Sequence, residues 1–111
     1  MSSARLESLG AGRFSVSGTL DASTVTSVLE QSAGLFADTP EVYVDLGGVT
    51  DSDSAGLALL IEWLKLAHQQ RRTMHFVDLP AQIAALARIS EVEDLLHANG
   101  VAPPQVAAAS A

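Results

Sequence analysis

Cysteine is absent from the sequence, and this absence excludes two classes of structure. Without a thiol the chain forms neither a disulfide framework nor a thiolate metal site, and it fits a reducing compartment. Basic residues are also few: 6 Lys and Arg stand against 13 Asp and Glu, a formal net charge of −7. Nucleic-acid binding and adhesion to anionic lipid both require a basic surface, so the charge argues against both.

Long apolar runs are missing as well. No segment approaches the roughly 18 consecutive apolar residues of a membrane-spanning helix, and the first residues, Met-Ser-Ser-Ala-Arg-Leu-Glu, carry no secretory signal. We therefore expect a cytoplasmic protein. What the chain does have is 48% hydrophobic residues over 111 positions, which suffices for one domain with a single core.

Motifs for catalysis and metal binding are also absent. His68, His75 and His97 lie in three separate predicted elements and have no ligand spacing. The clustered aspartates have no neighbouring His or Lys to complete an acid–base pair, and no phosphate-binding loop follows a strand. We expect no enzymatic activity, no metal and no cofactor. If ATP hydrolysis is involved, another subunit performs it.

The order of predicted elements is that of a small α/β domain. Apolar alternation predicts four strands, over residues 5–9, 13–17, 42–46 and 73–79. Apolar spacing near 3.6 predicts four helices, over residues 24–36, 54–70, 80–89 and 91–97. Pro80 is expected in the first turn of the third helix, and Ser90 is expected to cap the fourth.

These elements predict a mixed four-stranded sheet covered by about four helices. Strand–helix–strand units cross over with a right hand and place their helices on a face of the sheet. Residues 1–98 would form this domain. The Ala/Pro-rich residues 99–111 carry no core pattern and are expected to be a disordered tail.

One polar segment lies between the best strand and the longest helix. It reads Asp-Ser-Asp-Ser-Ala-Gly-Leu over residues 51–57, and we call it the acidic junction. Because Asp accepts hydrogen bonds from the free amides of a first helical turn, Asp53 is the expected N-cap. Ser54 then begins the helix, with its hydroxyl at the positive end of the helix dipole. Such a hydroxyl can simply cap the helix, bind or carry a phosphate, or contact a partner.

The helix after the junction carries more leucine than one buried face requires. At about 100° per residue, one face collects the core positions Leu57, Leu60, Ile61, Leu64 and Ala67. Leu59 and Leu66 fall on the other side of the helix. They either pack against the third helix or form an apolar patch for a partner protein.

The motif Asp53-Ser54-Ala55-Gly56-Leu57, within this order of elements, resembles the STAS domain over about residues 5–98. In the anti-sigma-factor antagonists of that family the motif reads Asp-Ser-Ser-Gly-Leu, and a partner kinase phosphorylates its first serine, which corresponds to Ser54. Those antagonists usually have an apolar residue where this chain has Ser52. Asp51 and Asp53 would also repel a phosphate on Ser54, so we expect Ser54 to act without phosphorylation.

A second stretch resembles another branch of the same family. Gly56-Leu57-Ala58-Leu59-Leu60, followed by Leu79-Pro80-Ala81-Gln82, is similar to MlaB-like proteins. These are the cytoplasmic STAS subunits of the Mla ABC transporter, which moves phospholipids between the inner and outer membranes and maintains lipid asymmetry. The resemblance implies a non-catalytic subunit that binds an MlaF-like ATPase, and through it a permease, at the inner face of the inner membrane.

Six residues are predicted to contact the partner: the resemblance implies Ser54, and the spacing along the helix gives Leu59 and Leu66. The six are Ser52, Asp53, Ser54, Ala55, Leu59 and Leu66. The alternative is an anti-sigma-factor antagonist that a serine kinase regulates by phosphorylating Ser54. A more remote alternative is an enzyme that acts on a small molecule at the junction.

Overall fold

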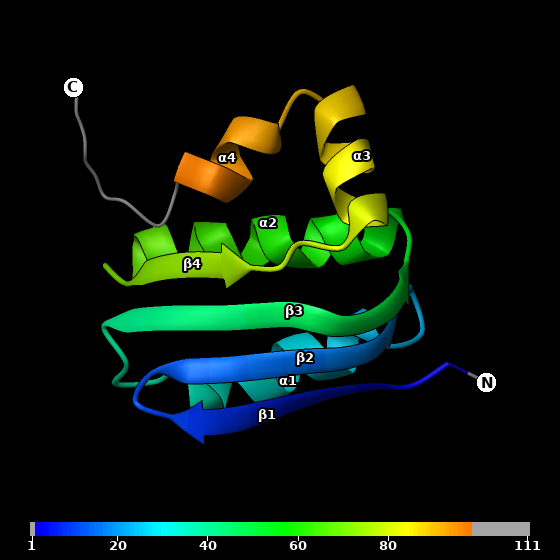
Figure 1. The fold of residues 1–111 in the computed structure, drawn as a ribbon. Coiled ribbons are helices and arrows are strands. Elements are labelled where there is room, and N and C mark those ends of the chain that lie inside the picture. Colours follow the sequence, from blue (N-terminus) through cyan, green and yellow to red (C-terminus); the bar gives the residue numbers. More distant parts are fainter. Residues whose placement is uncertain (1, 99–111) are drawn as a thin grey trace.

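Four strands form one mixed sheet in the spatial order β1-β2-β3-β4 (Figure 1). The computed structural model describes residues 2–98. β1 (Ala4–Gly10) pairs antiparallel with β2 (Arg13–Leu20), whereas β3 (Glu41–Ser52) runs parallel to both β2 and β4 (Thr73–Val77). The predicted mixed four-stranded sheet is confirmed. The predicted tail, residues 99–111, lies outside the described residues.

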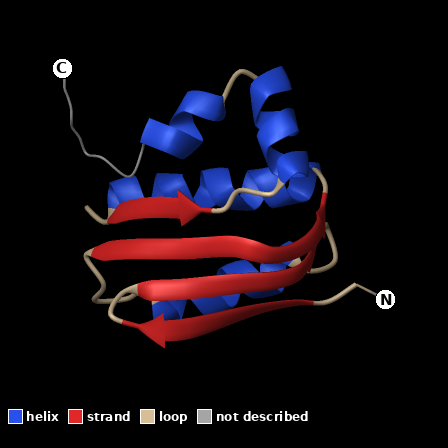
Figure 2. Ribbon diagram, in the orientation of Figure 1, coloured by secondary structure: helices blue, strands red, loops and turns tan. Residues whose placement is uncertain are grey.

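Four helices accompany the sheet. They are α1 (Val25–Leu35), α2 (Ser54–Gln69), α3 (Ala81–Ile89) and α4 (Glu93–Ala98). In Figure 2, α1 and α2 lie behind the strands, and α3 and α4 stand beyond the β4 edge. Within residues 2–98, no helix combines the length and hydrophobicity needed to cross a bilayer.

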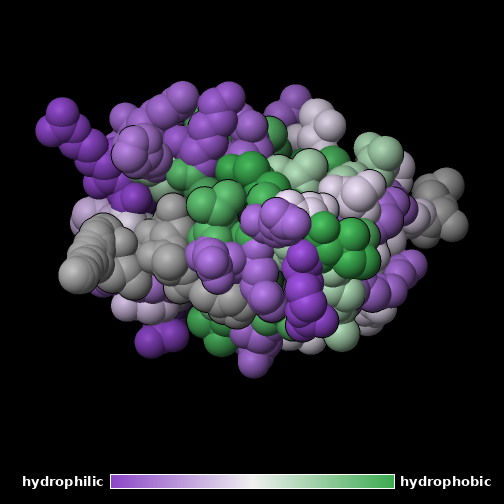
Figure 3. Space-filling model, turned by 90° about the horizontal axis from the view of Figure 1, so that it is seen from above, coloured by the Kyte–Doolittle hydropathy of each residue, from purple (hydrophilic) through white to green (hydrophobic). Residues whose placement is uncertain are grey.

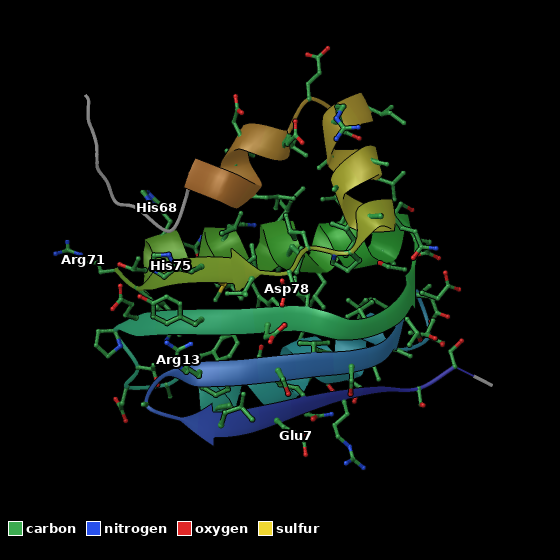
Figure 4. The ribbon with its side chains drawn as sticks, viewed as in Figure 1. Glu7, Arg13, His68, Arg71, His75 and Asp78 are labelled. Carbon is green, nitrogen blue, oxygen red and sulfur yellow. The ribbon has the colours of Figure 1, made fainter. Side chains whose placement is uncertain are left out.

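Strand alternation explains why only one face of the sheet is covered. In β3, Val42, Val44 and Leu46 are fully buried beneath the helices, as period-two burial requires. The intervening Tyr43 lies on the other face, where its ring stacks on His75 at a centroid distance of 4.4 Å and lies 5.2 Å from the guanidinium carbon of Arg13 (Figure 4). This face carries mostly polar side chains, and no helix within residues 2–98 covers it.

β3 is longer than the sequence pattern indicates. We predicted a strand that ends at residue 46 and a loop over residues 47–50, but β3 continues to Ser52 because β2 also continues beside it to Leu20. The two strands approach so closely that a Cβ on Gly48 would lie 2.9 Å from the Cβ of Ser17. The glycine therefore serves a close strand contact and does not mark a loop.

Three predicted boundaries near the C-terminal half are also wrong. β4 ends at Val77, before residue 79, because Asp78 adopts a positive φ of 57° that turns the chain out of the strand. Pro80 is the N-cap of α3 and lies just outside its first turn. Ser90 ends α3, its amide donating to the Leu86 carbonyl, so it does not cap α4.

Candidate partner-binding site

The acidic junction lies where β3 passes into α2, at the carboxyl end of the two central strands. The Asp53 amide donates to the Leu20 carbonyl at 3.2 Å, which ties the junction to the end of β2. Asp53 is the N-cap of α2, as predicted: its backbone is extended and its carboxylate accepts from the Ala55 amide at 2.8 Å. The cap fixes the direction in which α2 leaves the sheet.

Ser54 is the first residue of α2 and is exposed. Within residues 2–98 its hydroxyl has no hydrogen-bond partner, because Asp53 already provides the cap. The hydroxyl therefore lies at the positive end of a helix of 16 residues and remains available to another molecule.

Ser52 faces the opposite way and corrects one prediction. Its side chain is buried, 7% exposed, so it cannot serve as the partner contact that we expected. It packs against Gly56, where any added Cβ would collide with the Ser52 hydroxyl. The same Cβ would lie 3.2 Å from the Leu20 side chain and 3.4 Å from that of Ile83. The glycine in the motif is thus required by packing between α2, β3 and α3.

Gln82 of α3 holds the junction from the other side. The Ser52 amide donates to the Gln82 carbonyl oxygen at 3.0 Å, and the Gln82 amide nitrogen donates to Asp51 at 2.8 Å. β4 pairs with β3 only as far as Asp45, so the later amides on that edge of β3 have no neighbouring strand. Gln82 supplies the missing acceptor. Sequence reasoning assigned no role to Gln82, because its partners lie about 30 positions away.

Acidic residues lie near Ser54 along the chain. Besides Asp51 and Asp53, Asp21 lies at this end of the sheet, directly after Leu20 in the chain. Hydrogen bonds from the hydroxyls of Ser2 and Ser23 lower the pKa of Asp21, because they favour its ionised form. The end of the sheet that carries Ser54 thus also carries three acidic residues, a surface that suits a basic partner.

Leu59 corrects a second prediction. We expected it on an exposed patch, but it is only 3% exposed, because α1 covers this side of α2. With Val25 and Leu29 it lines a cleft of about 290 Å³ between the two helices. Both sequence interpretations overlooked α1: one assigned Leu59 to α3 and the other to a partner.

Leu66 lies farther along the same helix–helix boundary and is partly buried. It lines a second cleft of about 310 Å³ between α1 and α2. Ala55, directly after Ser54, is half-buried at the edge of the first cleft. The structure therefore places Asp53 and Ser54 exposed and Ala55 half-buried at the N-terminal end of α2, and Leu66 at a distance along the same helix.

Other apolar side chains are exposed on α3 and α4. Ile89 is 79% exposed and Leu95 is 51% exposed. Seen from the side of these helices, apolar side chains gather in the middle of the face and polar ones surround them (Figure 3).

In the described part of the chain, no group of three or more His, Cys, Asp or Glu side chains converges as a metal site.

Comparisons with known proteins identify the family of the chain. The family model described as "Mlab, STAS domain" matches residues 4–97. An anti-sigma-B factor antagonist from Staphylococcus aureus (strain NCTC 8325 / PS 47) is 33% identical over 85 residues, which cover 76% of this chain and 79% of that protein. The antagonist of the same name from Staphylococcus epidermidis is 32% identical over the same shares.

A solved structure shows the same fold. The anti-sigma factor antagonist SpoIIAA in its unphosphorylated form matches with a TM-score of 0.64 at 12% identity, over 81% of this chain and 82% of that one. This likeness supports the architecture of one mixed sheet and four helices. From the family match, the relatives and the fold together, the chain belongs to the STAS domain family.

Proposed function

We propose that this STAS protein is an anti-sigma-factor antagonist that binds an anti-sigma factor through the acidic junction and is switched by phosphorylation of Ser54. The observation that carries the proposal is the exposed Ser54 hydroxyl, which has no partner within residues 2–98 and lies at the N-terminus of α2. The relatives named anti-sigma-B factor antagonists, matched over 79% of their length, support the same function.

The neighbouring carboxylates do not prevent such a modification. Asp53 is engaged with the Ala55 amide and Asp51 with the Gln82 amide, so both are held by donors instead of facing Ser54 unpaired. The helix dipole also favours an anion at this position. We infer that these hydrogen bonds and the helix dipole reduce the repulsion between the carboxylates and a phosphate, so that Ser54, which we expected to stay unmodified, accepts one.

A phosphate on Ser54 would nevertheless change the surface strongly. It adds about −2 charge beside the carboxylates of the junction. A partner that fits the small neutral hydroxyl would then meet bulk and concentrated negative charge. We infer that phosphorylation releases the anti-sigma factor, whereas the unmodified form binds it.

The test uses purified protein, the anti-sigma factor encoded by the same organism, and ATP. Intact-mass analysis should show one added phosphate on the wild type and none on Ser54→Ala. Ser54→Ala should still bind, because it loses one hydrogen bond worth about 1 kcal/mol. Ser54→Asp should bind poorly, because its negative charge imitates the modified state.

Ser90→Ala is the matched control, because Ser90 is also exposed but lies at the end of α3, away from the junction. It should be phosphorylated and should bind like the wild type. Phosphate incorporation into Ser54→Ala at the wild-type level would contradict the proposal.

A second candidate rests on the family model, whose description names Mlab. In that function the chain is a non-catalytic subunit bound to the ATPase of a phospholipid-transport ABC transporter, at the inner face of the inner membrane. Ser54 is then a permanent contact: Ser54→Thr should preserve the complex, and Ser54→Arg should disrupt it. Affinity purification from native membranes distinguishes the two functions. Recovery of an ATPase and a permease, with Ser54 unmodified, would favour the transporter.

A further inference from the structure

The larger cleft between α1 and α2 has the size of a small ligand site. Its volume is about 310 Å³, within the range of roughly 300–1,000 Å³ that is common for such sites. Its walls are mainly apolar and come from both helices, with Leu29, Ala33 and Phe36 on the α1 side and Trp63 and Leu66 on the α2 side. An aliphatic group would fit these walls.

The polar atoms in the cleft floor are already paired. The Trp63 indole nitrogen donates to the Ser32 hydroxyl at 2.8 Å, and that hydroxyl donates to the Leu29 carbonyl at 2.6 Å. Trp63 is 1% exposed and Ser32 is 2% exposed, so the network is closed off from solvent. The floor therefore demands no polar group from a ligand.

Arg72 is different, because its charge is not neutralised by the chain. Its Nε donates to the Thr39 carbonyl at 3.0 Å, and its guanidinium carbon lies 6.0 Å from the centre of the Phe36 ring. These contacts hold the half-buried side chain at the edge of the cleft. Among residues 2–98, however, no carboxylate lies within ion-pair distance of Arg72, although the chain has 13 acidic residues.

We propose that this cleft binds a small anionic amphiphile, with an aliphatic chain along Leu29, Ala33 and Leu66 and a carboxylate on Arg72. A guanidinium offers paired donors in one plane, which match the two oxygens of a carboxylate. The site is separate from the acidic junction and does not depend on the function proposed above.

Glu30 sets the direction in which the ligand lies. It also lines the cleft, and it precedes Phe36 by six residues along the chain, about 9 Å of helix at the usual rise. An anion at that end would meet a carboxylate, whereas at the other end it meets Arg72. The charged group therefore binds at Arg72, and the chain points toward Glu30.

Octanoate is the probe for this site. Titration of the full chain, followed by amide chemical shifts and by calorimetry, should give saturable binding with shifts centred on α1 and the end of α2. Octanol has the same chain without the charge, and acetate has the charge without the chain. Each should bind at least about tenfold more weakly, because each loses one of the two interactions.

Two variants test the contacts separately. Arg72→Gln should weaken octanoate at least about tenfold, while Arg71→Gln should leave it unchanged. Arg71 is the matched control, because it is exposed, carries the same charge and does not line this cleft. Ala33→Phe adds a ring from an exposed helix position into the cleft, so it should block octanoate without disturbing the core.

Each outcome decides the proposal. Thermal melting of every variant identifies one that has lost its fold, and Ala33→Phe remains informative if Arg72→Gln melts early. Equal weakening by Arg71→Gln and Arg72→Gln would show binding to net charge alone and would overturn the site. Absence of saturable octanoate binding to the wild type would overturn it as well.

Discussion

Ser52 and Ser54 lie two residues apart, and the structure gives them opposite surroundings. Ser52 is the last residue of a strand and turns its side chain inward against Gly56. Ser54 is the first residue of a helix and turns outward. Asp53 between them caps the helix and fixes this change of direction. Only one of the two hydroxyls is therefore available for regulation.

Gly56→Ala should destabilise the domain, although alanine is the better helix former. The propensity gain is about 1 kcal/mol, but the new methyl group overlaps the Ser52 hydroxyl and crowds Leu20 and Ile83. Overpacking of this kind costs about 1–3 kcal/mol, so we expect a net loss of up to about 2 kcal/mol. Urea denaturation measures it. The double mutant Ser52→Gly/Gly56→Ala should be more stable than Gly56→Ala alone, because it removes the overlapping hydroxyl. A Gly56→Ala protein as stable as the wild type would contradict this packing.

Leu59 and Leu66 should respond differently to the same charge. Leu59 is 3% exposed beneath α1, so Leu59→Glu buries a carboxylate and should prevent folding or lower the melting temperature sharply. Leu66 is only partly buried, so Leu66→Glu should keep the fold with a smaller loss. Circular dichroism of the two single mutants decides. A folded Leu59→Glu protein would show that α1 does not cover this position.

At the scale of the element, the sequence predicted what depends on local contacts. Asp53 as cap and Ser54 as first helical residue follow from neighbouring residues alone, and both are found. The length of β3 depends on its pairing with β2, which no local pattern shows. Because glycines normally weaken a strand, the sequence pattern predicted an end six residues too early. Gln82 and Leu59 owe their positions to α3 and α1, elements distant in the sequence, which no local pattern indicates.

Gln82→Ala should loosen the connection between α3 and the acidic junction. It removes two hydrogen bonds, to Ser52 and Asp51, each worth about 1 kcal/mol, so we expect a loss of about 1–2 kcal/mol. Amide hydrogen exchange should accelerate at Ser52, whose donor loses its acceptor, more than at Val44 in the middle of β3. Gln82→Glu keeps an acceptor for the Ser52 amide but places a second negative charge beside Asp51. Its free energy of unfolding should therefore be no higher than that of Gln82→Ala. Unchanged exchange at Ser52 would contradict this role of Gln82.

At the scale of the molecule, charge is distributed unevenly around α2. The junction with Asp21, Asp51 and Asp53 lies at its N-terminal end, whereas Arg71 and Arg72 follow its C-terminal end. The helix dipole has the opposite sense, with its positive end at the acids and its negative end at the arginines. Each end is thus stabilised by the side chains beside it. An acidic surface at one end also gives the whole domain a preferred orientation toward a basic partner.

The rate of association with the proposed partner, an anti-sigma factor, should therefore depend on salt. Raising the ionic strength shortens the screening length to about 8 Å near physiological salt, so association measured by stopped-flow fluorescence should slow while dissociation changes little. Asp51→Asn removes one charge at the junction and keeps an oxygen for Gln82, so it should slow association roughly two- to threefold at low salt. Glu7→Gln removes the same charge from β1, an edge strand that is not part of the junction, and should have less effect (Figure 4). Equal slowing by the two variants would show that net charge, not the acidic junction, attracts the partner.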